Sequence, residues 1–459
     1  MFSETVLALS QWQMSISALL HFVFIPLTLG LSLLLVALES LYLLTNQAHY
    51  LNASRFWARL FSVNFSLALA SRLVLLCQFG AGSSYFSRYV GDVFALPLAI
   101  EALSSFFLAS VLFGPFWFGW ARLSKQQHWL ITCLLALCLN LSALWLISAY
   151  AWLENPVGAS FNLHSLRIEL NDVNQLLNNP AAIFKTLHLL GLCYAIAAAS
   201  VLAISAWLVS KNPNDPLGRI SYKLAAPIGL VAILLAWPIQ PTPNRLSQTI
   251  QQTALNGGNL QSLLPEVESH VRNGLTAYQS LLAWRDDDKN SALQAQVEQH
   301  QVDLGYALLL QRFTTHIENA TEQQIKLAAQ SALPAEPAAL LWTHRLLIGL
   351  GVLIMAGFIA ACVGGLGQGA LKPWLIKLSI FTAPLPWLLG LGDHFLNQAS
   401  QQPWLVAELL PSFLSYSSLS VSALAINFGI YLITGTGLVC VAGILMAYLT
   451  FSHARGAAQ

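Results

Sequence analysis

The chain has 459 residues, of which 56% are hydrophobic and only 9% are charged. Soluble domains carry about 25% charged residues, so this composition excludes a soluble globular protein and predicts a polytopic membrane protein. The formal net charge of +1 also excludes the strongly basic surface with which proteins bind nucleic acid.

Nine segments of the chain are long and apolar enough to cross a bilayer, for which a helix needs about 20 residues. In chain order, the expected membrane helices cover residues 17–45, 54–80, 93–121, 127–153, 180–210, 220–240, 339–363, 373–396 and 420–451. The sequence therefore predicts an all-α, polytopic membrane protein with about nine transmembrane helices.

One long polar segment interrupts this series. Residues 240–338 are rich in Gln and Asn and contain amphipathic runs, which predict a large external polar loop with short helices. We therefore divide the chain into residues 1–239 with transmembrane helices 1–6, the loop at 240–338, and residues 339–459 with helices 7–9. The loop also contains three scattered histidines, which we expect to be surface residues without a role in the chemistry: His270, His300 and His316.

Basic residues gather in one set of the short connections between helices. Arg122 and Lys125 follow the third expected helix, and Lys211, Arg219 and Lys223 follow the fifth. Short loops rich in Lys and Arg stay in the cytoplasm. This rule places the C-terminus in the cytoplasm and the N-terminus outside.

Five ionisable residues lie inside the expected membrane helices or at their edges: His21, Glu101, His188, His344 and Glu408. Such residues are rare in hydrocarbon and usually face a cavity, a proton relay or a cofactor. The alternative for each is a buried side chain that forms a hydrogen bond with a neighbouring helix. Histidine is also a common axial ligand of haem iron.

Two charged residues within the spans lack an obvious partner in their own segments. Glu101 lies in "LPLAIEALSSFFLASVLFG", which contains no other charged residue. A carboxylate in a low-dielectric pocket tends to hold its proton, which suits a proton relay. Arg72 lies in "LASRLVLL". We expect its long side chain to snorkel to the membrane surface, and the alternative is a pair with a haem propionate.

Six stretches form a set in the following order: "LLHFVFIPLTLG", "RFWARLFSVNFSLALA", "YVGDVFALPLAIEALSSFFL", "LNLSALWLISAYAWLENPVGASFN", "LAISAW" and "QPWLVAELLPS". Together they resemble subunit I of the cytochrome bd-type terminal oxidases. The resemblance covers the chain apart from the polar loop. It implies a nine-helix respiratory-chain protein of the bacterial inner membrane, which reduces oxygen to water. It also implies three haems near the outer face and a heterodimer with a similar second subunit, with a small single-helix subunit as a further candidate partner.

The resemblance assigns roles to individual residues. His21 stands at an axial ligand of the dihaem oxygen-reducing site, and Glu408 stands at the axial carboxylate of the high-spin haem b. Glu101 matches a carboxylate beside that site, implicated in proton delivery or haem binding, and Trp404 matches an aromatic residue between haems. His188 matches one axial ligand of the low-spin haem b, which accepts electrons from quinol. The cofactors implied are haem b and haem d, or a second haem b in place of haem d.

The chain departs from the family pattern in the part that oxidises quinol. The second ligand of the low-spin haem is a Met in the family, and Leu347 stands at its position, two residues after Arg345, which the resemblance places at the cofactor. His344 is the candidate substitute ligand. Gln401 replaces a family Arg, and Ala109 replaces a second carboxylate of the proton relay. The loop shows no counterpart of the family's quinol-binding Lys and Glu. The low-spin haem, quinol binding and the electron donor therefore stay open.

Two functions follow from this pattern. The first is an oxygen-reducing subunit I of a divergent bd-type oxidase, with Glu101 as a catalytic residue and either a donor other than quinol or a rebuilt quinol site. The second is a non-catalytic haem-binding or structural paralogue of that subunit. The retained residues His21, Glu101 and Glu408 favour the first function, and the losses around the low-spin haem favour the second.

Overall fold

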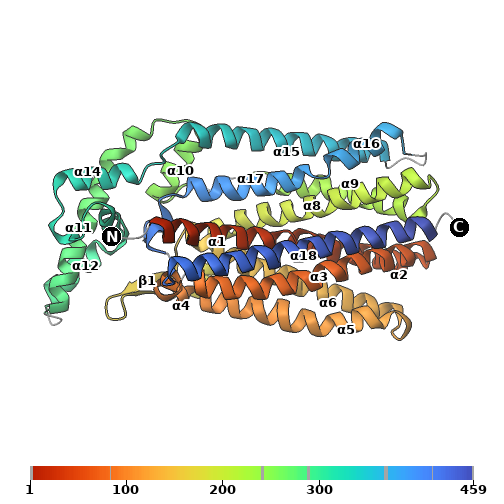
Figure 1. Cartoon of the computed structure of the whole chain (residues 1–459), viewed down its shortest axis with the longest axis horizontal. Coiled ribbons are helices and arrows are strands. Elements are labelled where there is room, and N and C mark those ends of the chain that lie inside the picture. The colour runs from red at the N-terminus through yellow and green to blue at the C-terminus, as the bar shows by residue number, and fades with distance from the viewer. Residues whose placement is uncertain are drawn as a thin grey trace.

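The computed structural model describes residues 4–82, 84–238, 242–286, 290–365, 371–415 and 417–456. Within these residues, nine helical segments are long and apolar enough to span a membrane, which confirms the expected all-α fold. They run side by side as a bundle, and the residues of the polar loop gather at one end of it (Figure 1). The first helix begins at the loop end, and the last helix ends at the opposite end (Figure 1).

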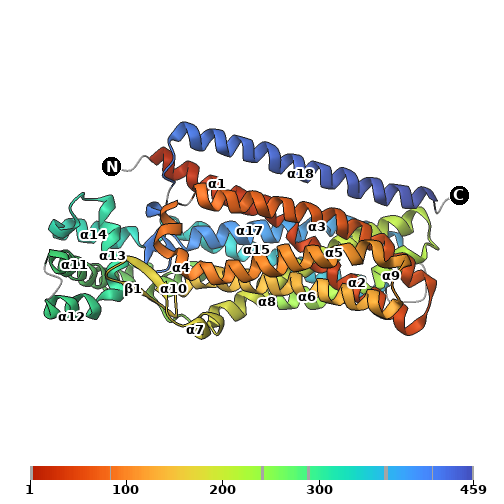
Figure 2. The same ribbon diagram turned by 90° about the horizontal axis from the view of Figure 1, so that it is seen from below.

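The spans are built from the following helices in chain order: α1 (Glu4–Phe22) with α2 (Ile25–Thr45), α3 (Ala48–Gly82), α4 (Ser84–Glu101) with η1 (Ala102–Leu108), α5 (Ala109–Phe118) and η2 (Gly119–Ala121), α6 (Lys125–Glu154), α8 (Pro180–Lys211), α9 (Pro216–Leu235), α15 (Pro337–Gly365), α16 (Pro373–Thr382) with α17 (Leu385–Ser400), and α18 (Val421–Gly456). Helix α18 lies on the outer side of the bundle, next to α1 and α3 (Figure 2).

The first span begins at Thr5 and not at residue 17. Its N-terminal part carries polar side chains that hide it from a hydropathy reading. Gln13 and Ser17 are both fully buried, which shows that these side chains face the bundle and not lipid. The expected end of the sixth span, at residue 240, lies outside the described residues.

Two irregularities in the helices lie beside ionisable residues. The break between α1 and α2 follows His21, and Pro26 stands in the first turn of α2, where its missing N–H is not needed. The second irregularity follows Glu101, where α4 continues as the π-helical segment η1. Segments of π-helix are rare and are frequent at functional sites.

The end of the bundle at which the polar loop lies is built from short elements, which are β1 (Ala159–Asn162), β2 (Arg167–Leu170), α7 (Val173–Leu177), α10 (Leu246–Asn256), η3 (Leu260–Leu263), α11 (Leu264–Asp286), α12 (Ser291–Gln299), η4 (Gln301–Asp303), α13 (Leu304–Leu308), η5 (Leu309–Arg312), η6 (Ile317–Asn319), α14 (Glu322–Ser331), β3 (Trp404–Val406), β4 (Leu410–Pro411) and η7 (Ser412–Leu414). Strands β1 and β2 pair antiparallel, and so do β3 and β4.

Two hydrophobic cores hold these parts together. The larger core lies within the bundle and includes side chains of α2, α3, α8 and α9. The second core joins the loop to the bundle, because Val267 and Tyr306 of the loop pack with Leu396 of α17 and Trp404 of β3. Full burial of one such side chain contributes about 1.5–3 kcal/mol to folding. The loop is therefore fixed to the end of the bundle by the same kind of packing that holds the bundle itself.

Candidate functional site

His21 is buried in the last turn of α1, and its ring is held by a serine of α3. Nδ1 of His21 lies 2.8 Å from Oγ of Ser71, and Oγ of Ser71 in turn donates to the carbonyl oxygen of Ala68 at 2.9 Å. A hydroxyl has one proton to donate. We therefore assign the proton of the imidazole to Nδ1, which donates to Ser71, and a lone pair to Nε2. This is the tautomer that an axial haem ligand needs, with a partner that fixes the ring.

Glu101 is buried and has a charged partner from another helix. Arg72 of α3 binds the carboxylate through two groups: Nε donates to Oε1 at 3.1 Å, and Nη2 forms an ion pair with Oε2. Ser105 donates to Oε1 at 2.9 Å, and Ser142 of α6 donates to it at 3.3 Å. Side chains from α3, η1 and α6 thus hold this carboxylate.

The expectation that Arg72 snorkels to the membrane surface is wrong. Its side chain is only 10% exposed, because the buried carboxylate of Glu101 draws the guanidinium inward. A paired arginine and carboxylate share two hydrogen bonds with matched geometry, which offsets part of the cost of removing both charges from water. Arg72 follows Ser71 directly in the chain, so consecutive residues of α3 hold His21 and Glu101. Ala109, at the end of the π-helical segment, is fully buried.

Glu408 lies between β3 and β4 at the loop end of the bundle and is buried. Its φ of 63° is in the left-handed region, which a residue with a side chain adopts only when its surroundings impose it. Oε1 accepts from the backbone N of Ser247 at 2.8 Å, and Oε2 accepts from Nη1 of Arg245 at 3.3 Å. Arg245 also donates to the carbonyl oxygen of Pro156 at 2.9 Å. The start of the polar loop thus holds this carboxylate in place.

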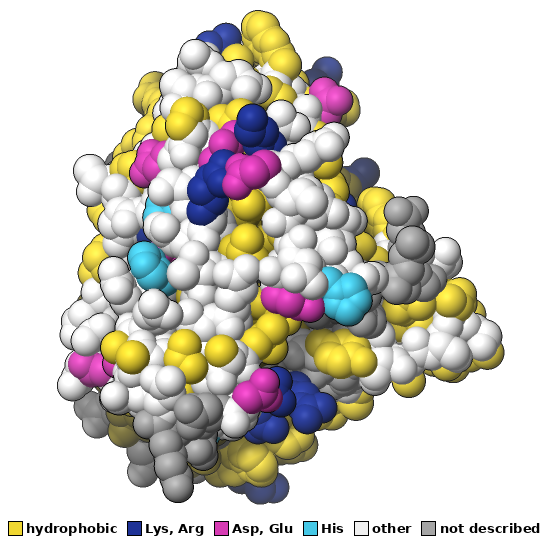
Figure 3. All heavy atoms as spheres, turned by 90° about the vertical axis from the view of Figure 1, so that its left-hand side faces the viewer, with side chains coloured by type: hydrophobic (Ala, Val, Ile, Leu, Met, Phe, Trp, Pro, Cys, Tyr) yellow, Lys and Arg dark blue, Asp and Glu magenta, His cyan; other side chains and the backbone are white. Residues whose placement is uncertain are grey.

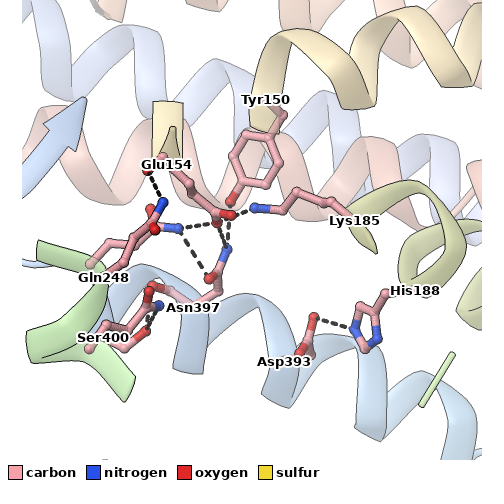
Figure 4. Close-up of polar contacts among 10 residues, drawn as sticks. Tyr150, Glu154, Lys185, His188, Gln248, Asp393, Asn397 and Ser400 are labelled. Atoms are coloured by element: carbon pink, nitrogen blue, oxygen red, sulfur yellow. Dashed lines mark hydrogen bonds and ion pairs between the residues drawn. The ribbon is translucent and has the colours of Figure 1, made fainter. Parts of the chain in front are cut away.

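His188 of α8 makes a contact that the sequence did not indicate. Nδ1 donates to the carbonyl oxygen of Ala236 at 2.7 Å, which leaves Nε2 as the atom available for iron. Nε2 lies 3.2 Å from Oδ2 of Asp393 on α17 (Figure 4). The acid of "LLGLGDHFL" is the signal that could have revealed this pair, because a lone acid in an apolar helix usually has a partner or a task.

The position that the family gives to the methionine ligand is packed against the same helix. A Cβ atom on Gly392 would lie only 2.5 Å from Cδ2 of Leu347. Helix α17 therefore makes both contacts: its Gly392 touches Leu347, and its Asp393 touches His188. A low-spin haem needs two axial ligands on opposite sides of its ring, and Leu has no lone pair for iron. These residues do not fit a six-coordinate low-spin haem.

The two other residues placed at this haem point elsewhere. Nδ1 of His344 lies 3.4 Å from the carbonyl oxygen of Leu255, at the end of α10. Arg345 is exposed, and its guanidinium carbon lies 5.2 Å from the centre of the Trp342 ring. The structure thus does not bring His344 or Arg345 together with His188.

A cluster of polar residues joins α6, α8, α10 and α17 near the loop end of the bundle (Figure 4). Glu154 forms an ion pair with Lys185 and accepts from Nδ2 of Asn397 at 3.0 Å. Gln401, which stands where the family has an Arg, also donates to Glu154. Nζ of Lys185 lies 4.1 Å from the centre of the Tyr150 ring. Lys185 therefore supplies the positive charge in a network where the replaced arginine is now an amide.

Both the sequence and the fold of this chain are similar to those of known proteins. Residues 9–454 match the family "Cytochrome bd terminal oxidase subunit I". The chain is 32% identical over 500 aligned positions to "Cytochrome bd-II ubiquinol oxidase subunit 1" of Escherichia coli (strain K12), covering 98% of this chain and 96% of that protein. It is 30% identical to "Cytochrome bd ubiquinol oxidase subunit 1" of Bacillus subtilis (strain 168), covering 95% of this chain and 92% of that protein.

A solved structure shares the fold. It is the bd oxidase from Geobacillus thermodenitrificans, and the similarity covers 98% of this chain and 99% of that chain, with a TM-score of 0.69 and 17% sequence identity. The sequence match covers nearly the full length of the chain, and the nine candidate membrane spans agree with it. This chain belongs to the cytochrome bd terminal oxidase subunit I family.

Proposed function

We propose that this chain is the oxygen-reducing subunit I of a divergent bd-type oxidase, with a pair of haems held by His21 and Glu408. The tautomer of His21 carries the proposal, because the contact with Ser71 keeps a lone pair on Nε2 for iron. When bound, haem d and haem b, or two haems b, supply the redox chemistry that converts oxygen to water.

Glu408 suits the second ligand position. Each oxygen of its carboxylate accepts one hydrogen bond, from Ser247 or from Arg245. A carboxylate has about four lone-pair sites, so capacity for a metal remains. The imposed backbone conformation and the two donors fix the orientation of the group, as partners of a metal ligand commonly do.

We assign Glu101 to the proton relay of this site. Arg72 fixes the position of the carboxylate through its two contacts, so Glu101 receives and passes on a proton at a defined place. The hydroxyls of Ser105 and Ser142 lie on the same carboxylate and are the groups through which we route the proton, since Ala109 offers no second carboxylate. The pair with Arg72 therefore positions Glu101 within the relay.

We infer that the low-spin haem b is missing and that quinol is not the donor. The contacts of α17 with His188 and Leu347 support this inference, because they occupy both positions at which the family binds the iron of that haem. Electrons then reach the oxygen site from another donor at the outer face.

The assembly that we propose follows the family. The second oxidase subunit covers part of the apolar surface, a small single-helix subunit is a further candidate partner, and lipid covers the rest. The protein lies in the bacterial cytoplasmic membrane, with its N-terminus outside and its C-terminus in the cytoplasm. The exposed apolar side chains of α18, such as Ile426, Ile430 and Ile433, suit either a partner helix or lipid.

A reduced-minus-oxidised spectrum of purified membranes tests the proposed function. A high-spin haem signal, with or without haem d, and no low-spin haem b would support it. A protein that carries no haem at all would overturn it.

The second candidate is a non-catalytic paralogue, and specific contacts favour it. Three side chains at cofactor positions have opposite charges or acids as partners within the chain, namely Glu101 with Arg72, Glu408 with Arg245 and His188 with Asp393. These pairs stabilise the fold without a cofactor. The same spectrum separates the two candidates.

A further inference from the structure

Three aromatic rings connect the surface of the polar loop with the segment that carries Glu408. The ring of His270 stacks on Tyr306, with 5.1 Å between centroids and 23° between planes. Tyr306 meets Trp404 edge to face, with 5.0 Å between centroids and 71° between planes. Tyr306 and Trp404 are buried, whereas 34% of the His270 side chain reaches solvent. The series therefore runs from the surface into the site.

Close packing of the backbone fixes this series. A Cβ atom on Gly305 would lie 2.0 Å from the carbonyl oxygen of Glu408, and a Cβ atom on Gly274 would lie 2.2 Å from the carbonyl oxygen of Asp303. Only glycine allows α11, the turn at Asp303 and the Glu408 segment to approach this closely. Nδ1 of His270 lies 2.6 Å from Oδ1 of Asp303, which holds the outermost ring in its stack.

The loop around the exposed ring is acidic. Residues 240–338 contain ten acidic and six basic residues, a net charge of −4. Glu266 is exposed on α11 one turn before His270, and Glu268 follows on the same helix. Acidic, basic and histidine side chains all lie at this end of the molecule, among mostly uncharged groups (Figure 3). A surface of negative potential attracts cationic partners and speeds their encounter.

We propose that His270, Tyr306 and Trp404 form the electron-transfer route from a cationic one-electron redox protein, docked on the acidic face of the loop, to the haem iron bound at Glu408. This inference rests on the proposed function and names the class of donor and its docking site. It gives His270 a role in electron transfer, in place of the sequence-based expectation that this residue has no role in the chemistry.

The transfer oxidises the donor by one electron and reduces ferric haem iron to ferrous. No bond forms or breaks, and no proton moves. The rings serve as a bridge of contacting π systems between donor and iron.

The test uses the purified complex and a small, reduced, cationic c-type cytochrome as the donor probe, without oxygen. Stopped-flow absorbance measures the rate at which the haem of the complex becomes reduced. We expect Tyr306→Leu to slow this rate several-fold, because it removes a ring, and the matched control Tyr306→Phe to keep the wild-type rate. A small neutral reductant should reduce the haem of all variants equally.

A second variant covers the case in which Tyr306→Leu does not fold. His270→Leu removes the partly exposed ring and should slow reduction by the probe in the same way. Equal rates in wild type and in the ring-deleted variants, with the haem intact, would overturn the route and leave the proposed function standing. A complex without haem would overturn both.

Binding of the probe supplies a readout that does not depend on haem. Glu266→Gln with Glu268→Gln should weaken the affinity of the complex for the cytochrome, and added salt should weaken it further. Glu266→Gln alone is compared with Glu336→Gln, an exposed change of the same single charge beside α15, which is the control and should leave the affinity unchanged. Equal affinity in the double variant and the control would overturn the docking site.

Discussion

Nε2 of His188, the atom with which this histidine would bind haem iron, lies 3.2 Å from Oδ2 of Asp393. Gly392, the preceding residue, touches Leu347, where the resemblance places the family's methionine ligand. One short stretch of α17 thus lies against both positions.

The low-spin haem should therefore return only when both obstacles are removed. We expect Leu347→Met alone to leave the haem spectrum unchanged, and Leu347→Met combined with Asp393→Ala to add a low-spin haem b signal, because methionine ligation gives a low-spin centre. Asp393→Ala alone is the control. A wild-type spectrum with a low-spin haem b that His188→Ala abolishes would contradict this reasoning.

The oxygen site should depend on the contact between His21 and Ser71. We expect His21→Ala to remove one high-spin haem signal while the protein stays in the membrane. Ser71→Ala should weaken haem retention by about 10–100-fold, the usual cost of losing a partner of a metal ligand. Ser62→Ala on the same helix also removes a hydroxyl that donates to a carbonyl, and it should have no such effect. Unchanged haem content in Ser71→Ala would refute the assigned role of the serine.

The buried pair of Arg72 and Glu101 should show strong coupling in stability. Removing one partner of a buried ion pair leaves an uncompensated charge and costs about 3–5 kcal/mol. Arg72→Met and Glu101→Gln should each lower the thermal stability of the purified protein, and the double variant should be less destabilised than the sum of both. Additive effects would mean that the two side chains do not depend on each other.

The packing of the loop should weaken as pH rises. The hydrogen bond with Asp303 raises the pKa of His270 above its ordinary value, with the charge of Asp303 adding to it. A group with a raised folded pKa contributes stability that is fully present below its unfolded pKa of about 6.5 and is lost as pH rises through the folded value. Hydrogen exchange of α11 and α13 should report faster opening above that value.

Two variants check the origin of this pH dependence. Asp303→Asn should abolish it, because the neutral amide no longer favours the imidazolium. His316→Gln should leave it in place, because the His316 side chain is 73% exposed and pairs only with Glu318. A pH dependence that survives Asp303→Asn would assign it to another group.

Quinol should be a poor donor. The sequence of the loop predicts no counterpart of the Lys and Glu with which the family binds quinol, and Gln and Asn cannot accept its protons near neutral pH. With short-chain quinol as sole donor, oxygen consumption by the purified heterodimer should stay well below about 10 per second, a median enzyme rate. Turnover at or above that rate would show that the quinol site has been rebuilt.

Hydropathy was sufficient to predict the fold, and local motifs named several candidate site residues. The nine spans could be predicted because lipid demands long apolar helices. His21 and Glu408 could be named because each lies in a stretch that resembles the family. The start of the first span was missed, since Gln13 and Ser17 are polar residues that face inward.

The partners of the site residues could not be predicted. Arg72 and Glu101 are 29 residues apart, Arg245 and Glu408 are 163 apart, and His188 and Asp393 come from helices on either side of the loop. No spacing rule connects such positions, because the packing of the helices alone decides which side chains meet. The same limit applies to the stack of His270 on Tyr306, which depends on how two loop helices fold together.

The attachment of the loop to Glu408 has a consequence for evolution. Arg245, Ser247 and Gly305 all contact Glu408, and all three belong to the polar loop, in which we predict that the quinol-binding residues are absent. A relative's quinol-binding loop grafted onto this chain would take away the groups that hold the carboxylate and its strained backbone. Reversion to the ancestral donor would thus require coordinated changes in two distant parts of the gene, and the divergence is hard to undo by single steps.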